Sequence, residues 1–144
     1  MKRFKFTLQS LLNVKLSLEK QQKSELAAAQ ARLDGFVREL ADMETRLEAQ
    51  RAEYDLQGGP AVRTFDLAAR DIGFKALFER MDSQREKIRV AETERTRVRK
   101  QLTETMGERK MLEKLQEKQR ERYQEEVRRE EAKLMDDFMS HQLS

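Results

Sequence analysis

The sequence predicts an all-α fold in which two long helices form an antiparallel coiled-coil hairpin. Charged residues make up 40% of the 144 residues, hydrophobic residues 38% and aromatic residues 6%, with no tryptophan. This composition is typical of long helices and coiled coils, and apolar residues recur at heptad spacing. The strongest helix breakers, Gly58, Gly59 and the single proline Pro60, are adjacent. We therefore expect a helical arm at 1–57, a turn at 58–64 and a second arm at 65–144, in a single elongated domain.

The first arm carries a regular heptad pattern from residue 26 onward. Its two alternating sets of positions are Leu26, Leu33, Leu40, Leu47 and Tyr54, and Ala29, Phe36, Met43 and Gln50. A seam of this kind predicts a coiled coil. Upstream, Leu8, Leu11 and Leu18 follow the same rule in a different frame. We therefore expect a stutter at Leu18, Gln22 and Leu26, where the supercoil unwinds locally.

Local signals mark where each helix starts and stops. Thr7 is placed to cap the first helix, with Phe6 and Leu11 at the positions of a hydrophobic staple. Pro60 lacks a backbone donor, and the two glycines before it tolerate positive φ, so together they end the helix and make a turn. Asp66 then lies in the first turn of the next helix, where a carboxylate favours the helix dipole.

The second arm has a longer but softer apolar stripe. Its members are Phe74, Leu77, Phe78, Met81, Ile88, Ala91, Val98, Leu102, Met106 and Leu112, followed by Tyr123, Val127, Leu134 and Phe138. Arg95, Arg109 and Gln116 interrupt the stripe. We therefore expect weaker pairing at these points of the seam.

Two registers of the hairpin are compatible with the heptads. The first pairs Met43 with Met81, Phe36 with Ile88, Leu26 with Val98, and Leu12 with Leu112. It leaves Tyr123, Val127, Leu134 and Phe138 without a partner in the chain. The second register uses a wider turn and pairs Leu8 with Leu134 and Phe4 with Phe138. Heptad repetition does not choose between them.

The sequence offers little that could support catalysis. It contains no cysteine, and its single histidine, His141, has no second ligand or nucleophile at a motif spacing. No Gly-Lys-Ser/Thr follows Gly58 and Gly59, so they do not form a phosphate loop. Two paired helices also lack the concave pocket that enzymes need. We expect no enzymatic activity, no metal and no cofactor.

Charge and hydropathy also narrow the possible partners. The 30 basic and 27 acidic residues give a net charge of +3, and both signs are interleaved as on solvated helix surfaces. We therefore do not expect a nucleic-acid partner. No segment has the ~20 consecutive apolar residues of a membrane span, and polar residues interrupt the apolar start of the chain, unlike a secretory signal. We expect a cytoplasmic protein without direct membrane insertion, monomeric as a hairpin when free.

Three stretches are candidates for binding through a helical surface, although each is also a candidate for the seam. At the start, apolar residues lie among Lys2, Arg3 and Lys5. Beyond the turn, "GFKALFERMDSQR" at 73–85 aligns Phe74, Phe78, Met81 and Arg85 along one helix face. Near the end, residues 108–138 place dense charge around a thin apolar line.

These three stretches, in this order around a central turn, resemble the FliJ family of the bacterial flagellar type III export apparatus. The opening "FKFTLQSLLNVK" and the closing "ERKMLEKLQEKQRERYQEEVRREEAKLMDDF" carry the resemblance, which covers nearly the whole chain. It implies a coiled-coil hairpin similar to the central stalk of rotary ATPases. The end with both termini would enter the pore of the hexameric export ATPase and promote ring assembly and turnover.

The resemblance also implies which residues contact which partner. The expected ATPase-docking residues are Phe4, Phe6, Leu8, Leu11, Leu12, Tyr123, Val127, Leu134 and Phe138. The cytoplasmic domain of the export gate would bind Phe74, Phe78, Met81 and Arg85, with Arg85 the weaker match. Export chaperones are further expected partners. Such a protein would be associated peripherally with the inner face of the cell membrane at the flagellar base.

A basic run offers a further expected contact. Arg95, Arg97 and Arg99 lie in "ERTRVRK" and could meet acidic pore loops of the ATPase. Two other functions fit the same sequence. One is the stalk of a virulence-type secretion injectisome. The other is a general export chaperone, or holdase, that binds unfolded substrates along an apolar groove.

Overall fold

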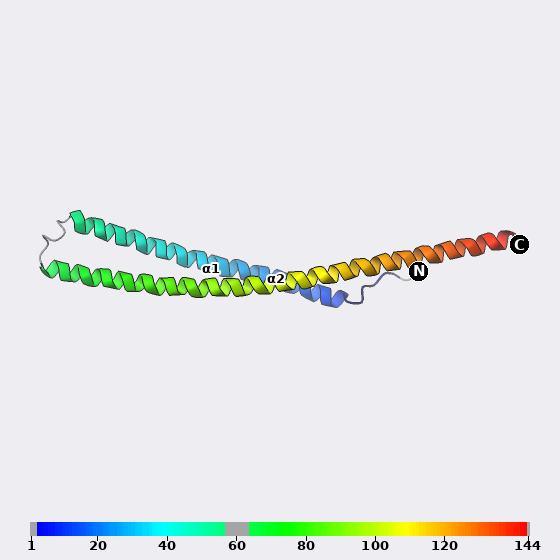
Figure 1. Ribbon diagram of the computed structural model, residues 1–144, viewed down its shortest axis with the longest axis horizontal. Helices are drawn as coiled ribbons and strands as arrows, with labels where there is room; N and C mark the ends of the chain where they lie inside the picture. Colours follow the sequence, from blue (N-terminus) through cyan, green and yellow to red (C-terminus); the bar gives the residue numbers. More distant parts are fainter. Residues whose placement is uncertain (1–2, 57–63, 144) are drawn as a thin grey trace. The chain divides into compact units, whose positions relative to one another are not determined.

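The protein is all-α, as the heptads predict. The computed structural model describes residues 3–56 and 64–143, and these form two helices, α1 (Gln9–Leu56) and α2 (Thr64–Leu143), shown in Figure 1. The expected turn residues Gly58, Gly59 and Pro60 lie outside the described residues. The described residues fall into two compact units, one formed by 23–56 with 64–100 and the other by 3–22 with 101–143. Each unit pairs a piece of α1 with a piece of α2.

The start of α1 differs slightly from the expected cap. The Leu12 amide donates the first α-helical hydrogen bond to the carbonyl of Leu8 at 2.9 Å, and the Gln9 amide donates to Phe6 at 3.1 Å. The residue before the first helical one is therefore Leu8 and not Thr7. Phe6 is nevertheless buried, whereas Leu11 is largely exposed. The hydrophobic contact at this helix start consequently does not follow the expected staple.

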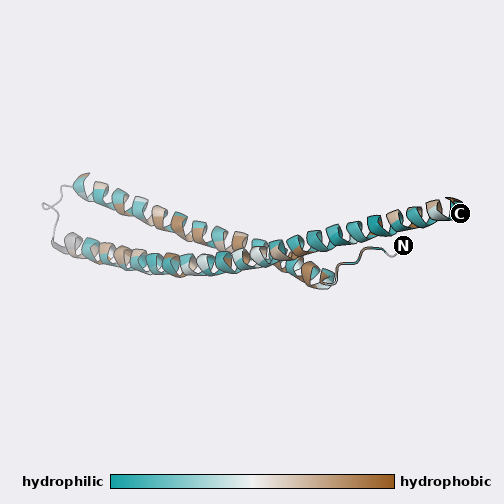
Figure 2. Cartoon of the chain, turned by 45° about the vertical axis from the view of Figure 1, so that its right-hand side comes forward, coloured by the Kyte–Doolittle hydropathy of each residue, from teal (hydrophilic) through white to brown (hydrophobic). Residues whose placement is uncertain are grey.

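The unit of residues 23–100 has an apolar seam. Leu47, Leu77 and Met81 form its buried cluster, and Leu40, Met43 and Phe74 pack against it. Further along the same seam, Leu33, Ala91 and Val98 are buried. Figure 2 shows the corresponding alternation of hydrophobic and hydrophilic residues along both helices. The predicted heptad positions from Leu26 to Tyr54 turn inward here except Gln50, which is exposed.

Cross-helix contacts in both units follow the first of the two expected registers. The Arg95 guanidinium donates to the Gln30 side chain at 3.3 Å. In the other unit, Gln116 donates to Gln9 at 3.1 Å, and Lys15 forms an ion pair with Glu108. The second register, with Leu8 opposite Leu134 and Phe4 opposite Phe138, is therefore wrong. Leu134 and Phe138 are 68% and 60% exposed, as the first register requires.

Tyr123 does have a partner, contrary to expectation. The extended residues before α1 place the Phe4 ring 5.6 Å from the Tyr123 ring, at an interplanar angle of 46°. Val127 is half-buried. A heptad pattern predicts contacts between helices alone. Phe4 lies before the helix, so the pattern could not predict its contact with Tyr123.

The expected stutter in α1 is also wrong, because the seam runs through this part of the helix without a break in the heptad. Leu18 is half-buried, and the buried residues of α1 up to Gln22 are Leu12, Glu19 and Gln22, with Lys15 half-buried between Leu12 and Glu19. These positions are three or four residues apart, as in an unbroken heptad. Lys15 and Glu19 face α2 because each forms an ion pair with an oppositely charged residue of that helix.

Among the described residues, no helix is apolar enough over a sufficient length to cross a membrane.

Met81→Ala should lower the free energy of unfolding by about 2–3 kcal/mol, because the side chain is 3% exposed in the apolar cluster. Thermal and urea unfolding followed by circular dichroism would measure the loss. Met111→Ala is the matched control, since Met111 is 71% exposed and its removal should change stability by less than about 0.5 kcal/mol. Equal effects of the two substitutions would contradict the assignment of the seam.

The register can be tested by cross-linking, because the chain has no native cysteine. A short bis-maleimide should join Gln30→Cys to Arg95→Cys within one chain, because the native side chains are in contact. The control pair Glu48→Cys with Arg95→Cys would be close only in the second register, which displaces α1 by roughly 27 Å along its axis. Mass spectrometry of the monomer band should find the first cross-link, and preferential formation of the second would overturn the register.

Candidate interaction surfaces

Polar side chains occupy several seam positions of α2 in the unit of residues 23–100. Gln84 is 2% exposed, and its amide donates to the Phe36 carbonyl at 2.8 Å and to the Glu39 carboxylate at 3.0 Å. The Arg70 guanidinium lies 5.3 Å from the centre of the Tyr54 ring, a cation–π distance. The two hydrogen bonds satisfy the buried Gln84 amide, whereas Arg70 Nη1 is buried without a hydrogen-bond partner.

The seam of the other unit is more polar still. Arg109 forms ion pairs with Glu19 of α1 and with Glu113 of α2, the latter at 2.9 Å. The hydrogen bonds to Glu113 and then to Glu19 raise the pKa of Arg109 above its usual value. Glu19 is buried, so this pair is shielded from solvent. Replacing Arg109 with an uncharged residue would take an opposite charge away from the buried Glu19 carboxylate, which is costly.

The expected ATPase-docking residues divide into a packed group and an exposed group. Phe6 and Leu12 are buried, and the centre of the Phe4 ring lies 5.6 Å from the centre of the Tyr123 ring and 5.6 Å from the Arg120 guanidinium. Leu8, Leu11, Leu134 and Phe138 are exposed, and Val127 is half-buried. Phe4, Tyr123 and Val127 also line an open groove along α2. The structure therefore brings Phe4, Tyr123 and Val127 together and leaves Leu134 and Phe138 farther along the helix.

The expected gate-docking residues also divide. Met81 belongs to the buried cluster and Phe74 packs against it. Phe78 is 41% exposed, and Arg85 is exposed with an ion pair to Asp82 at 2.9 Å. Phe78 and Arg85 each follow a buried seam residue directly, so they share one outer flank of α2. Only these two of the four present their side chains largely to solvent.

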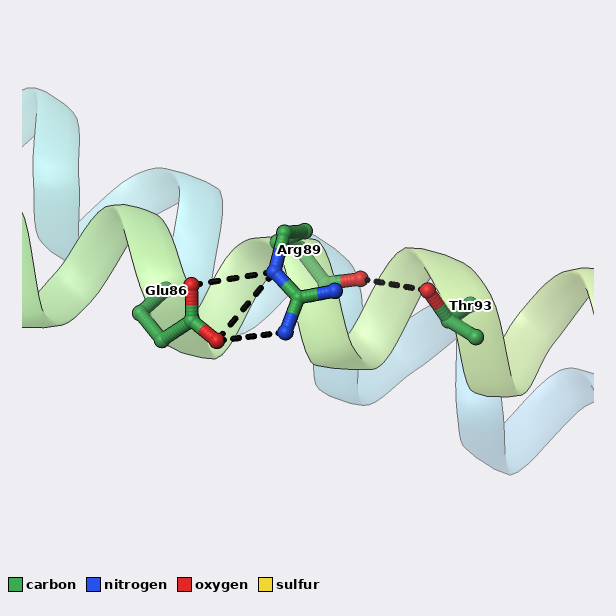
Figure 3. A network of polar contacts seen from close by, with 3 residues as sticks. All are labelled: Glu86, Arg89 and Thr93. Atoms are coloured by element: carbon green, nitrogen blue, oxygen red, sulfur yellow. Dashed lines mark hydrogen bonds and ion pairs between the residues drawn. The ribbon is translucent and has the colours of Figure 1, made fainter.

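The basic run is largely paired within the chain. Arg95 is half-buried and contacts Gln30, while Arg97 donates to Glu94 at 3.0 Å. Arg99 also has an interaction partner within the chain. The same kind of pairing recurs nearby, where the Arg89 guanidinium binds Glu86 and the Thr93 hydroxyl donates to the Arg89 carbonyl at 3.0 Å (Figure 3).

These exposed pairs have an electrostatic effect but little weight in stability. The hydrogen bond and charge of Arg89 lower the pKa of Glu86, and those of Arg97 lower the pKa of Glu94. Lowered carboxyl pKa values give stability that is present at neutral pH and lost as the pH falls through them. Exposed pairs of this kind contribute little because water screens them.

The exposed surfaces of the two units are candidates for binding partner proteins. Among residues 3–56 and 64–143, no group of three or more His, Cys, Asp or Glu side chains is placed to hold a metal ion. What the described units offer is exposed apolar side chains beside charged helix faces.

Sequence reasoning missed the Glu19–Arg109 pair. Arg109 interrupts the apolar stripe of the second arm, and Glu19 is the neighbour of Leu18 in the first. Their opposite charges at facing positions could have predicted the ion pair. The register had to be known before that signal could be used.

The comparisons with known proteins point the same way as the helical architecture. The family model described as "Flagellar FliJ protein" matches residues 4–144. No curated protein and no solved structure matches the chain. Because the family model covers essentially the whole chain, the protein belongs to the flagellar FliJ protein family.

Proposed function

We propose that this protein is the stalk component of the flagellar type III protein export apparatus. It inserts into the ring of the hexameric export ATPase and promotes ring assembly and turnover without performing chemistry. It also links the ring to the cytoplasmic domain of the export gate and assists export chaperones. The observation that carries the proposal is the family match over residues 4–144. The paired helices of the unit that contains both termini are compatible with it.

The physical basis of the ATPase contact is a set of weak interactions. The outer faces of the helices carry exposed ion pairs such as Arg120 with Glu117, and each such pair contributes less than about 1 kcal/mol. A ring whose subunits change conformation in turn needs a partner that none of them binds too tightly. A face of many weak contacts satisfies that requirement.

Exposure refines the residues that would contact the ATPase. Phe6 and Leu12 are occupied by packing within the chain, so we assign the contact to Leu134 and Phe138 first. Phe4, Tyr123 and Val127 would contribute through the groove that they line. Arg97 and Arg99 would meet acidic pore loops only by exchanging partners. Arg95 instead contributes to the seam through Gln30.

For the gate, the same reasoning selects Phe78 as the anchor and Arg85 as its neighbour. Phe74 and Met81 hold the helices together beneath them. We further propose that the protein works in the cytoplasm, peripherally associated with the inner face of the cell membrane at the flagellar base. The flagellar family match favours this machine over a virulence-type injectisome or a holdase.

Addition of the protein to the purified export ATPase should increase the rate of ATP hydrolysis. Leu134→Glu with Phe138→Glu should abolish most of the increase, because two carboxylates would be buried in an apolar contact. Val37→Glu with Val90→Glu is the control, as these side chains are 47% and 54% exposed in the other unit. An ATPase that does not respond to the wild-type chain, or that responds equally to all three proteins, would refute the assignment.

Phe78→Ala should weaken binding to the cytoplasmic domain of the gate at least about fivefold, with little change in melting temperature, because the ring is exposed in the free protein. Phe74→Ala should instead lower the melting temperature, since that ring packs on the seam. Isothermal titration calorimetry and circular dichroism would separate the two effects. Unchanged gate binding by the Phe78 variant would remove this residue from the proposed contact.

A further inference from the structure

The unit formed by residues 3–22 and 101–143 buries charge and exposes leucine. On α1, the inward positions after Leu12 are Lys15, Glu19 and Gln22. Leu11 and Val14 are meanwhile 44% and 59% exposed. Helices ordinarily turn their apolar residues toward the partner helix and their charges toward water. An exposed apolar stripe beside a polar seam therefore calls for something else that covers it.

Five apolar residues, four of them exposed and Leu18 half-buried, form a stripe on one side of the helix pair. Leu11 and Leu18 each directly precede a buried residue of α1, and Leu115 directly precedes the half-buried Gln116 of α2. In two antiparallel helices with facing seams, residues that precede a seam residue lie on the same side of the pair. Helical spacing adds Val14 to the α1 row and Met111 to the α2 row. We call these five residues the outer stripe: Leu11, Val14, Leu18, Met111 and Leu115.

The opposite side of the same pair has a different character. There the residues that follow seam residues are mostly charged or polar, and they include Asn13, Lys20, Lys110 and Glu117. Glu117 pairs with Arg120, and Glu113 pairs with Arg109. Leu16, 43% exposed, is an apolar exception on this side, so the outer stripe is the more apolar of the two sides.

One end of the outer stripe is basic. Lys118 and Arg122 continue the row of Met111 and Leu115 at the same helical spacing, and both are exposed. Arg3 and Lys5, from the extended residues before α1, line the same groove as Arg122. Glu126 and Glu130 also line that groove. We call Arg3, Lys5, Lys118 and Arg122 the basic end.

We propose that the outer stripe binds an amphipathic helix of a partner protein, whose apolar face is flanked by acidic residues at one end. The helix lies along the stripe as a third helix, with apolar anchors spaced three and four residues apart. Its acidic end lies over the basic end, which fixes its direction. Leu134, Phe138 and Phe78, the residues assigned first to the ATPase and gate contacts, lie outside the stripe, although Leu11 was expected to dock the ATPase and most of the basic end lines the groove of Phe4 and Tyr123. The test below uses the protein without the ATPase or the gate, so its outcome is separate from theirs.

The probe for this site is a labelled 21-residue helical peptide with leucines on one face and glutamates at one end. Fluorescence anisotropy should show binding to the full-length protein, with an affinity that falls as salt is raised. A second peptide with lysines in place of the glutamates should bind about tenfold more weakly. Equal binding of the two peptides would overturn the proposed charge recognition.

Val14→Glu with Met111→Glu should weaken binding of the acidic peptide by at least about tenfold. The exposed positions should leave helicity unchanged by circular dichroism. Val90→Glu with Met135→Glu, at similarly exposed positions away from the stripe, is the control and should bind as the wild type does. No binding by the wild type, or equal binding by all variants, would refute the site. Light scattering that showed a dimer abolished by the Val14 and Met111 changes would assign the stripe to a second copy and refute the proposal.

Discussion

The pairing of α1 with α2 depends on polar side chains that lie in the seam. Leucine, methionine and alanine pack acceptably in any register that keeps the heptads facing, so they determine that the helices pair but not where. Gln84, Arg95 and Arg109 are more demanding, because a buried amide or guanidinium without a partner is costly. Each finds its partner on α1 in one and the same register. Polar residues at these positions reduce the apolar area that the seam buries, but they specify one alignment of the helices, as polar seam residues do in other coiled coils.

How far the sequence could predict this structure follows from that distinction. Composition and heptads were sufficient for two long helices and for the apolar seam between Leu26 and Val98. They were insufficient for the frame near the start of α1, where Leu11 and Leu18 looked like seam residues and Glu19 took the inward place. The reason is that the frame there is chosen by Arg109, which lies 90 residues away in the sequence. Phe4 on Tyr123 was unpredictable for a related reason, since an extended segment has no periodicity to interpret.

For the predicted docking surfaces, residue type alone did not predict which side chains are exposed to a partner protein. Phe74, Phe78, Met81 and Arg85 occupy one helical row in the sequence, yet two of them pack inward and two face outward. The outward pair is what a partner can reach without opening the helices. The same division separates Phe6 and Leu12 from Leu134 and Phe138. Family membership points to the flagellar export apparatus, and burial shows which side chains are exposed for contacts with partners.

The enclosed pair of Glu19 and Arg109 constrains how this part of the molecule can change over evolutionary time. Loss of Arg109 takes an opposite charge away from the buried Glu19, whereas loss of Glu19 leaves Arg109 its ion pair with Glu113. A substitution at position 109 should therefore be best tolerated together with a change at position 19. Related chains that keep the same alignment should therefore show these columns varying jointly, as an exchanged pair or as two apolar residues. Chains in which the columns vary independently would have to align their helices by other means.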